Sequence, residues 1–377
     1  MKCKFSRLSF LVIFLFFPTV IAQASTDYPF YTVQPGETLS IIADKFNITV
    51  NEIINLNNIS NPNLISPGTQ LLIPGLQGIS GELTTHTIQI GENLNVFSQK
   101  YSIPDSILYK MNRLTSPNEV YAGSDLIISI SQSKAARIPV MKLSAGQSLA
   151  EVSILLNMNP WFLPAIYSEP PLAKVILEDL LYLPSNLGYS EINPISPLIR
   201  SISVTPLPLS QGNTEVIKLE TIKPCNITGR LDERELHFSS YEENIYYAYQ
   251  GIHAMADPGL ASLIISGSDD NKISFSFQQM LLLKPTPFLT DPPINVSDQT
   301  IDPAVTQPED DFVKSLVNIV TPEKLWTGKF VYPIDEPICF KSLFGNRRSY
   351  NNSTLISFHT GVDFGVCAPS LNVYSAA

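Results

Sequence analysis

A regular repeat in the first half of this 377-residue chain constrains its fold more than any other feature. Gly36, Gly91 and Gly146 are spaced by 55 residues (36 to 91 and 91 to 146). The apolar positions that follow keep this spacing: Leu39, Leu94 and Leu149; Ile48, Ile103 and Met158; Ile53, Leu108 and Leu163; Leu71, Leu126 and Leu181. A repeat of this length indicates an array of small modules. The chain is also long enough for several further units.

Each unit of the repeat has the pattern of two short strands and two short helices. In the first unit a β-like run over 31–34 precedes the turn Pro35-Gly36-Glu37. Thr38 is a helix-capping residue type, and apolar residues follow it at helical spacing as far as Phe46. A second apolar pattern begins at Val50, and a final strand over 70–74 follows the turn Pro67-Gly68. The sequence therefore predicts a β-α-α-β unit with paired strands and both helices on one face.

The first unit resembles a LysM domain, a family that binds N-acetylglucosamine-containing glycans such as peptidoglycan and chitin. Three segments carry the resemblance, and they read YTVQPGETL from Tyr31, NLN from Asn55 and PGTQLLIP from Pro67. The second copy has Ala122 in place of that proline, and the third has Tyr167 where the others have asparagine. The repeat predicts a LysM domain over 28–75, a LysM-like repeat over 83–131 and a degenerate one over 137–185.

The resemblance also implies where a sugar would lie in the first unit. It places the groove between the loop before the first helix and the loop before the second strand, which contain Gly36, Glu37, Thr38, Leu64, Ile65 and Ser66. Backbone N–H and C=O groups on such loops can bond the N-acetyl group of a sugar. A structural spacer without glycan binding is the alternative for every unit. It is open for the second unit, and it is the preferred reading for the third.

The N-terminus has the pattern of a secretory signal. Lys2, Lys4 and Arg7 precede an apolar run, and Ala22-Gln23-Ala24 is a small-x-small cleavage site, so we expect a signal peptide over 1–24. A membrane anchor is the alternative, but the apolar run is short for a span, and no later run reaches the required length of about 18 residues. We therefore expect a secreted, cell-wall-associated protein. The net charge of −10 argues against a nucleic-acid partner.

The middle of the chain reads as a β domain. Short strand-like runs over 197–284 alternate with turn residues at the spacing of an antiparallel sandwich. Glu235–Phe238 is one of the predicted strands. The context resembles the immunoglobulin-like domains that precede the peptidase in some exported cell-wall enzymes. Residues 285–325 are rich in Pro and Asp and predict an extended linker, with one short helix over 312–320.

The C-terminal segment, 326–377, carries two linked motifs. A Phe344-Gly345-x-Arg347-Arg348 run precedes His359-x-x-x-Asp363. Together they resemble the start of an M23 (LytM-type) zinc metallopeptidase, and the resemblance makes His359 and Asp363 two ligands of a catalytic Zn²⁺. The family's later His-x-His motif has no counterpart here, so we expect an incomplete zinc site, no catalytic histidine and an inactive chain as given. A polar turn without metal is the alternative.

Two smaller readings concern the same segment. Cys339 and Cys367 flank the His/Asp motif and fit either a disulfide or two buried thiols. Arg347 and Arg348 fit a structural salt bridge better than a substrate contact.

The resulting prediction is a multidomain α+β chain: LysM-like repeats, an immunoglobulin-like sandwich and the start of an all-β M23-like peptidase domain. The predicted function, assigned to a full-length parent of which this chain carries a truncated peptidase domain, is an exported peptidoglycan hydrolase that cleaves peptide cross-links. The alternative is a non-catalytic protein that binds glycan or regulates hydrolases.

Overall fold

The computed structural model describes residues 28–130, 137–143, 147–167, 180–193, 195–321, 325–351, 356–367, 370 and 372–376. The predicted signal peptide and Gly146 lie outside these residues. The chain divides into two compact units, residues 1–82 and residues 83–377. None of the helices in the described residues combines the length and the apolar character that a membrane span needs.

The first unit has the predicted β-α-α-β order. Strand β1 (Phe30–Thr32) pairs antiparallel with β2 (Gln70–Leu72), and helices α1 (Leu39–Phe46) and α2 (Val50–Asn57) lie between them in the chain. The side chain of Thr38 caps α1 by accepting a hydrogen bond from the N–H of Ile41, as its position before the helix predicted. Apolar side chains of both helices and β2 form the core: Leu39, Ile42, Phe46, Ile53 and Leu71 are all buried.

The second repeat follows the first at the predicted offset. It consists of β3 (Glu82–Thr87), α3 (Leu94–Tyr101), α4 (Asp105–Asn112), the 3-10 turn η1 (Pro117–Glu119) and β4 (Asp125–Ile130). Strands β3 and β4 are neighbours in one sheet. Asn93 replaces the threonine cap and accepts a hydrogen bond from the N–H of Val96 at 3.1 Å, so the change of residue preserves the start of the helix.

The third repeat is degenerate in sequence but retains the fold. Strand β5 (Arg137–Lys142) pairs antiparallel with β6 (Leu180–Pro184), and α5 (Leu149–Leu155) and α6 (Phe162–Tyr167) lie between them in the chain; the turn η2 (Ser185–Leu187) follows. Ser148 and Glu151 form a capping box at the start of α5. Leu149, Val152, Leu163, Leu181 and Leu183 form a core of their own.

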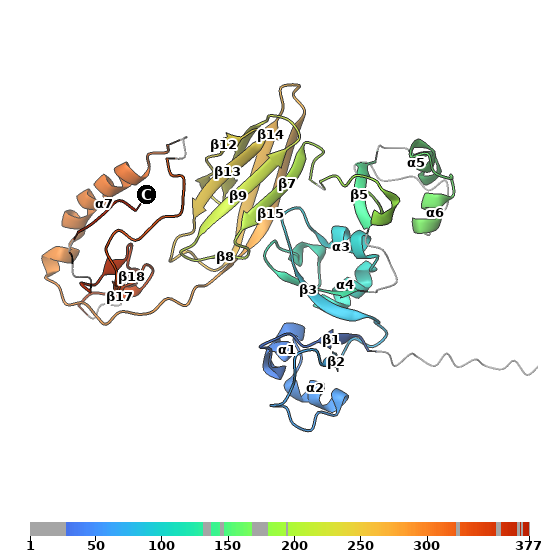
Figure 1. The fold of residues 1–377 in the computed structure, drawn as a ribbon, viewed down its shortest axis with the longest axis horizontal. Helices are drawn as coiled ribbons and strands as arrows, with labels where there is room; N and C mark the ends of the chain where they lie inside the picture. The colour runs from blue at the N-terminus through green and yellow to red at the C-terminus, as the bar shows by residue number, and fades with distance from the viewer. Residues whose placement is uncertain are drawn as a thin grey trace, which may run out of the picture. The chain divides into compact units, whose positions relative to one another are not determined.

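Residues 199–284 form two β-sheets that lie face to face (Figure 1). One sheet has the order β12-β13-β9-β7, and the other has the order β11-β10-β14-β15-β8. The strands are β7 (Ile199–Thr205), β8 (Leu209–Ser210), β9 (Thr214–Thr221), β10 (Asn226–Leu231), β11 (Arg234–Glu235), β12 (Ser239–Glu242), β13 (Ile245–Gly251), β14 (Gly259–Ser268) and β15 (Ser274–Lys284). Buried side chains from both sheets, such as Leu219 on β9 and Leu263 on β14, share one core.

The strand predicted over Glu235–Phe238 is wrong except at Glu235, which ends β11. The chain leaves the five-stranded sheet after β11 and enters the four-stranded sheet at β12, so residues 236–238 cross between the two sheets. Leu236 is buried on the way, and its N–H donates to the carbonyl oxygen of Gly229. The segment that crosses between the sheets alternates polar and apolar residues, as a half-buried strand does, which explains the error.

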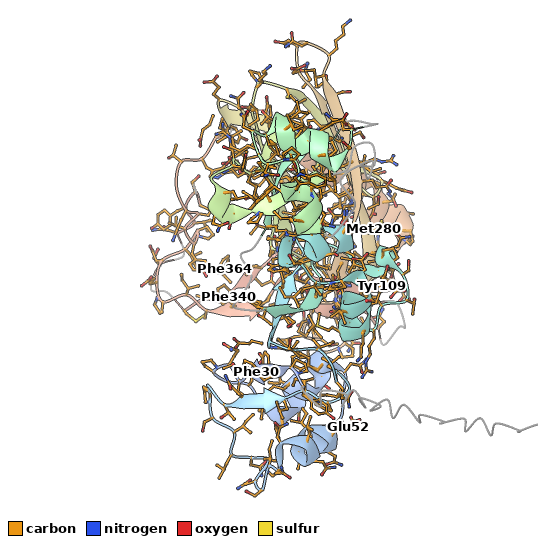
Figure 2. The ribbon with its side chains drawn as sticks, turned by 90° about the vertical axis from the view of Figure 1, so that its right-hand side faces the viewer. Phe30, Glu52, Tyr109, Met280, Phe340 and Phe364 are labelled. Carbon is orange, nitrogen blue, oxygen red and sulfur yellow. A yellow bond between two sulfur atoms is a disulfide. The ribbon has the colours of Figure 1, made fainter. Side chains whose placement is uncertain are left out.

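The C-terminal part contains η3 (Asp298–Ile301), α7 (Pro303–Val317), and two strand pairs: β16 (Phe340–Ser342) with β19 (Asp363–Phe364), and β17 (Arg347–Ser349) with β18 (Ile356–Phe358). Figure 2 shows Phe340 and Phe364 side by side on the first pair, with ring centroids 5.6 Å apart. The helix predicted over 312–320 begins earlier, at Pro303. Asp302 caps the helix by accepting a hydrogen bond from the Ala304 N–H. Proline suits the first helical position because it has no N–H that would need a partner.

Candidate functional sites

The two predicted glycan loops of the first unit lie at the same end of its strand pair. The loop with Gly36, Glu37 and Thr38 follows β1, and the loop with Leu64, Ile65 and Ser66 precedes β2. Because β1 and β2 are antiparallel, the bases of these two loops lie side by side. The N–H of Val33 donates to Thr69, and the N–H of Gly68 donates back to Val33. Gly36, Thr38, Leu64 and Ser66 are exposed, and Ile65 is half-buried.

Glu37 has a structural role within this loop. Its carboxylate accepts hydrogen bonds from the Tyr31 hydroxyl (2.9 Å), the Gln34 N–H (2.8 Å) and Lys45 Nζ (2.5 Å). Burial by itself would raise the pKa of Glu37, but the bonds from Lys45, Gln34 and Tyr31 outweigh it and hold the pKa below its ordinary value. The structure therefore places Glu37 beneath the loop, where it positions the exposed backbone of its neighbours.

The sequence analysis did not identify Tyr31 and Lys45 as partners of Glu37. The second repeat contains the equivalent set at the same offset: His86 Nε2 lies 2.7 Å from Glu92, the Gln89 N–H donates to Glu92 at 2.9 Å, and Lys100 lies 3.7 Å away. The sequence did contain a signal for this set: Glu37 and Lys45 recur as Glu92 and Lys100 at the repeat spacing.

The His/Asp motif of the C-terminal part forms a close pair. Asp363 begins β19 and His359 follows β18 directly, as predicted. His359 Nε2 lies 3.3 Å from Asp363 Oδ1. The other ring nitrogen, Nδ1, lies 3.3 Å from the carbonyl oxygen of Leu343, which is the arrangement that orients a metal-binding histidine. Hydrogen bonds from the His359 N–H to Asn346 and from the Gly345 N–H to His359 fix the backbone on which the ring sits.

Arg348 connects this pair to a second carboxylate. Its Nε lies 3.0 Å from Asp291, and its Nη2 lies 3.3 Å from Asp363 Oδ2. Asp291 also accepts hydrogen bonds from Ser342 (3.0 Å) and Asn346 (2.7 Å). Burial alone would raise the pKa of Asp291, but the bonds from Arg348, Asn346 and Ser342 hold it below its ordinary value. The predicted salt bridge of Arg348 is thus present, while Arg347 donates to the carbonyl oxygen of Ala254 at 2.8 Å.

The segment predicted as a linker supplies Asp291. It is extended as expected, but it also pairs with β17: the Arg347 N–H donates to Leu289, and the Asp291 N–H donates back to Arg347. Gly345 has a φ of 85°, and a Cβ there would meet the Phe288 ring at 2.0 Å. This contact explains the glycine of the Phe-Gly-x-Arg-Arg run.

Cysteine pairing in the same region is settled by the structure. Cys339 and Cys367 form a disulfide with a Cα–Cα distance of 6.1 Å, and Cys225 is free and buried. Of the two alternatives drawn from the sequence, the disulfide is therefore the correct one.

A catalytic zinc needs about three protein ligands. In the described part of the chain no group of three or more His, Cys, Asp or Glu side chains is placed to hold a metal ion. The facing nitrogen and oxygen of His359 and Asp363 fit two ligand positions. The zinc assignment stays a prediction.

Comparison with known proteins supports the reading of the repeats. The family model described as LysM domain matches residues 31–74 and 86–129, the first two of the three repeats. The N-acetylmuramoyl-L-alanine amidase sle1 of Staphylococcus saprophyticus is 36% identical over 109 residues, covering 26% of this chain and 33% of that protein. A Staphylococcus aureus protein named "Probable autolysin SsaALP" is 38% identical over 101 residues, covering 25% and 37%.

A fungal protein aligns over a longer stretch. The Secreted LysM effector ECP6 of Passalora fulva is 23% identical over 179 residues, which are 41% of this chain and 77% of that protein. The alignments with the two staphylococcal relatives span only about a third of the length of each. This chain carries two LysM domains, at residues 31–74 and 86–129.

Proposed function

We propose that this is an exported protein that binds peptidoglycan, or another glycan containing N-acetylglucosamine, through its first LysM domain. The observation that carries the proposal is the meeting of two exposed loops at one end of the β1–β2 pair. Within the described residues, the N–H of Gly36 and the carbonyl oxygen of Glu37 have no hydrogen-bond partner. A sugar acetamido group carries one N–H and one C=O, so it can satisfy both. The comparisons agree, since the bacterial relatives are named as an amidase and an autolysin.

Two glycines of the first unit allow a matched test. Gly36 and Gly78 have φ values of 83° and 80°, and a Cβ added to either meets nothing within 4 Å. Alanine at either position carries the same backbone strain, but only Gly36 lies in the proposed groove. We expect Gly36→Ala to weaken retention of the chain on purified cell walls and chitin by about tenfold, an effect of the size of one or two lost hydrogen bonds. Equal retention of Gly36→Ala and Gly78→Ala would contradict the proposal.

We further propose that the C-terminal part belongs to an M23-like zinc metalloendopeptidase acting on peptide cross-links. The 3.3 Å approach of His359 Nε2 to Asp363 Oδ1 supports it, as does the bond that turns the opposite ring nitrogen toward Leu343. When bound, zinc would polarise the scissile carbonyl and lower the pKa of a water molecule. Arg348 would hold Oδ2 of Asp363 and leave Oδ1 for the metal. The proposal requires a third ligand besides these two.

Zinc content measured by mass spectrometry on the full gene product tests the peptidase proposal. We expect stoichiometric zinc, its loss in His359→Ala, and release of cross-link peptides from cell walls by the unchanged protein only. Zinc that is unaffected by His359→Ala would rule out this site.

A non-catalytic glycan-binding protein is the second candidate. The alignment that covers 77% of the fungal LysM effector favours it, because that relative is named for its LysM domains and secretion alone. Tight glycan binding together with absence of zinc from the full gene product would select this candidate.

A further inference from the structure

The second LysM domain uses its loops in a way that the first does not. Its Ala122 N–H donates to the carbonyl oxygen of Met280 at 3.0 Å, and the Leu282 N–H donates to the carbonyl of Ala122 at 2.8 Å. These bonds add one residue to the edge of β15, just before the stretch that pairs with β8. Ile90 and Ala122 belong to the buried core of the sandwich. The loops equivalent to the proposed groove of the first domain are therefore docked on the β-sandwich.

The side-chain amide of Gln279 reaches into the first of these loops. Its Oε1 accepts a hydrogen bond from the Gly91 N–H at 2.7 Å, and its Nε2 donates to the carbonyl oxygen of Glu92 at 3.1 Å. Gly91 and Glu92 correspond to Gly36 and Glu37 at the repeat spacing of the sequence. An amide that accepts from one backbone N–H and donates to one backbone C=O has the same bonding groups as the acetamido group of a sugar.

One residue difference between the copies affects the backbone contact of this docking. The first domain has Pro67 where the second has Ala122. Proline has no N–H, so the first domain cannot make the bond that Ala122 makes to Met280. The β-α-α-β unit itself accepts either residue, since both copies have the same order of two strands and two α-helices, with the short turn η1 added in the second.

Space for a ligand remains beside Gln279. A cavity of about 580 Å³ lies against the loops of the second domain, where Asn93, Asn118 and Tyr121 line it, and against Gln278 and Gln279 of β15. The volume is within the range of about 300–1,000 Å³ that small-molecule sites occupy. Side-chain amides and a tyrosine can exchange hydrogen bonds with the hydroxyl and amide groups of a sugar.

We propose that Gln279 occupies the acetamido position of the second LysM domain, which is a latent site for N-acetylated glycan. Displacement of the Gln279 amide opens the site, and the sugar ring then enters the adjoining cavity. The proposal rests on the proposed function, because it takes the equivalent loops of the first domain to bind sugar amides. The chain thus holds one available glycan site and one that its own sandwich fills.

Titration of the intact chain with the β-1,4-linked tetramer of N-acetylglucosamine tests this proposal. Calorimetry gives the number of sites. Hydrogen exchange of the Gly91 amide reports on its bond to the Gln279 side chain. Gln279→Ala removes the side-chain bonds to Gly91 and Glu92 and leaves the backbone bonds of Ala122 in place. Ser276→Ala is the matched control, because this residue of β15 bonds to the Ser266 side chain, does not line the cavity and, among the described residues, makes no hydrogen bond to the second domain. Ala122→Pro undocks the domain with the residue that the first copy carries.

We expect one site in the unchanged chain and in Ser276→Ala, and two sites in both Gln279→Ala and Ala122→Pro. The Gly91 amide should exchange about fivefold to tenfold faster in Gln279→Ala, as loss of one hydrogen bond implies, and the tetramer should restore its protection. A folded Gln279→Ala with a single site overturns the proposal. So does a second site in the unchanged chain with the Gly91 amide undisturbed.

The two proposals fail differently. No site in the unchanged chain but one in Gln279→Ala would refute binding by the first domain and uphold the latent site. No site in any variant would refute both.

Discussion

The hydroxyl of Tyr167 accepts a hydrogen bond from the N–H of Tyr182 at 2.8 Å and donates one to the carbonyl oxygen of the same residue at 2.9 Å. Asn57 makes the same two bonds to Leu72, at 2.7 and 2.9 Å, through its side-chain amide. Asn112 repeats them with Ile127. The third repeat thus keeps the connection between its second helix and its last strand by a different chemical group.

Removing this connection should destabilise a repeat. Asn57→Ala leaves both backbone groups of Leu72 without their protein partner. Because Leu72 is exposed and water can replace the amide, we expect a loss of about 0.5–1.5 kcal/mol in the free energy of unfolding of the first unit. Hydrogen exchange of the buried Ile53 and Leu71 amides measures it. Asn55→Ala, an exposed change on the same helix, should have little effect. Comparable losses in the two variants would contradict the role assigned to Asn57.

Acid should weaken the first LysM domain through Glu37. Its hydrogen bonds hold the pKa below the ordinary value in the folded state, so the unfolded state takes up the proton first as the pH falls. The stabilisation is present above the unfolded value of about 4.5 and is lost as the pH drops through the folded pKa. Denaturation of the unit at pH 6 and pH 3 should show this loss. Glu37→Gln should remove most of the difference between the two pH values.

Glu215 should give the opposite dependence in the β-sandwich. Its side chain is fully buried, Oε2 has no hydrogen-bond partner, and burial raises the pKa of this carboxyl to about 7. The unfolded state loses its proton near pH 4.5, while the folded state keeps it to about pH 7. Stability should therefore fall as the pH rises through this window, by on the order of 2 kcal/mol.

Urea denaturation of the sandwich at pH 5 and pH 8 measures the effect of Glu215. Glu215→Gln cannot ionise, so its stability should change much less between these two values. A Gln variant with the same slope as the unchanged protein would place the titrating group elsewhere.

Asp291 should stabilise the C-terminal part. Asp291→Asn removes the negative charge that Arg348 faces at 3.0 Å in a largely buried position, so we expect a loss of about 1–3 kcal/mol. Asp310→Asn, on the exposed face of α7, is the control. Thermal unfolding of the two variants, followed by near-ultraviolet circular dichroism of the aromatic side chains, measures the difference. Equal melting of both would show that the contact contributes nothing.

Local patterns in the sequence predicted the repeats well. The bounds of α1 and α2 follow from Thr38, the apolar spacing and Asn57-Asn58, all of which act within a few residues. The approach of His359 to Asp363 follows from their four-residue spacing around a turn. Contacts over long distances were not predictable in this way. Gln279 and Gly91 are separated by 188 residues, and a glutamine on a strand carries no sign of the loop that it will meet.

The contacts of residues 288–294 bear on how the C-terminal part can be studied in isolation. The segment pairs with β17, its Phe288 lies against Gly345, and its Asp291 holds Arg348, Asn346 and Ser342. A fragment excised at residue 326, where the composition changes, would leave three polar side chains and one edge of β17 without their native partners. A fragment for crystallography should therefore begin ahead of Phe288. A boundary chosen from the proline-rich composition, at residue 326, would lie beyond the whole of α7.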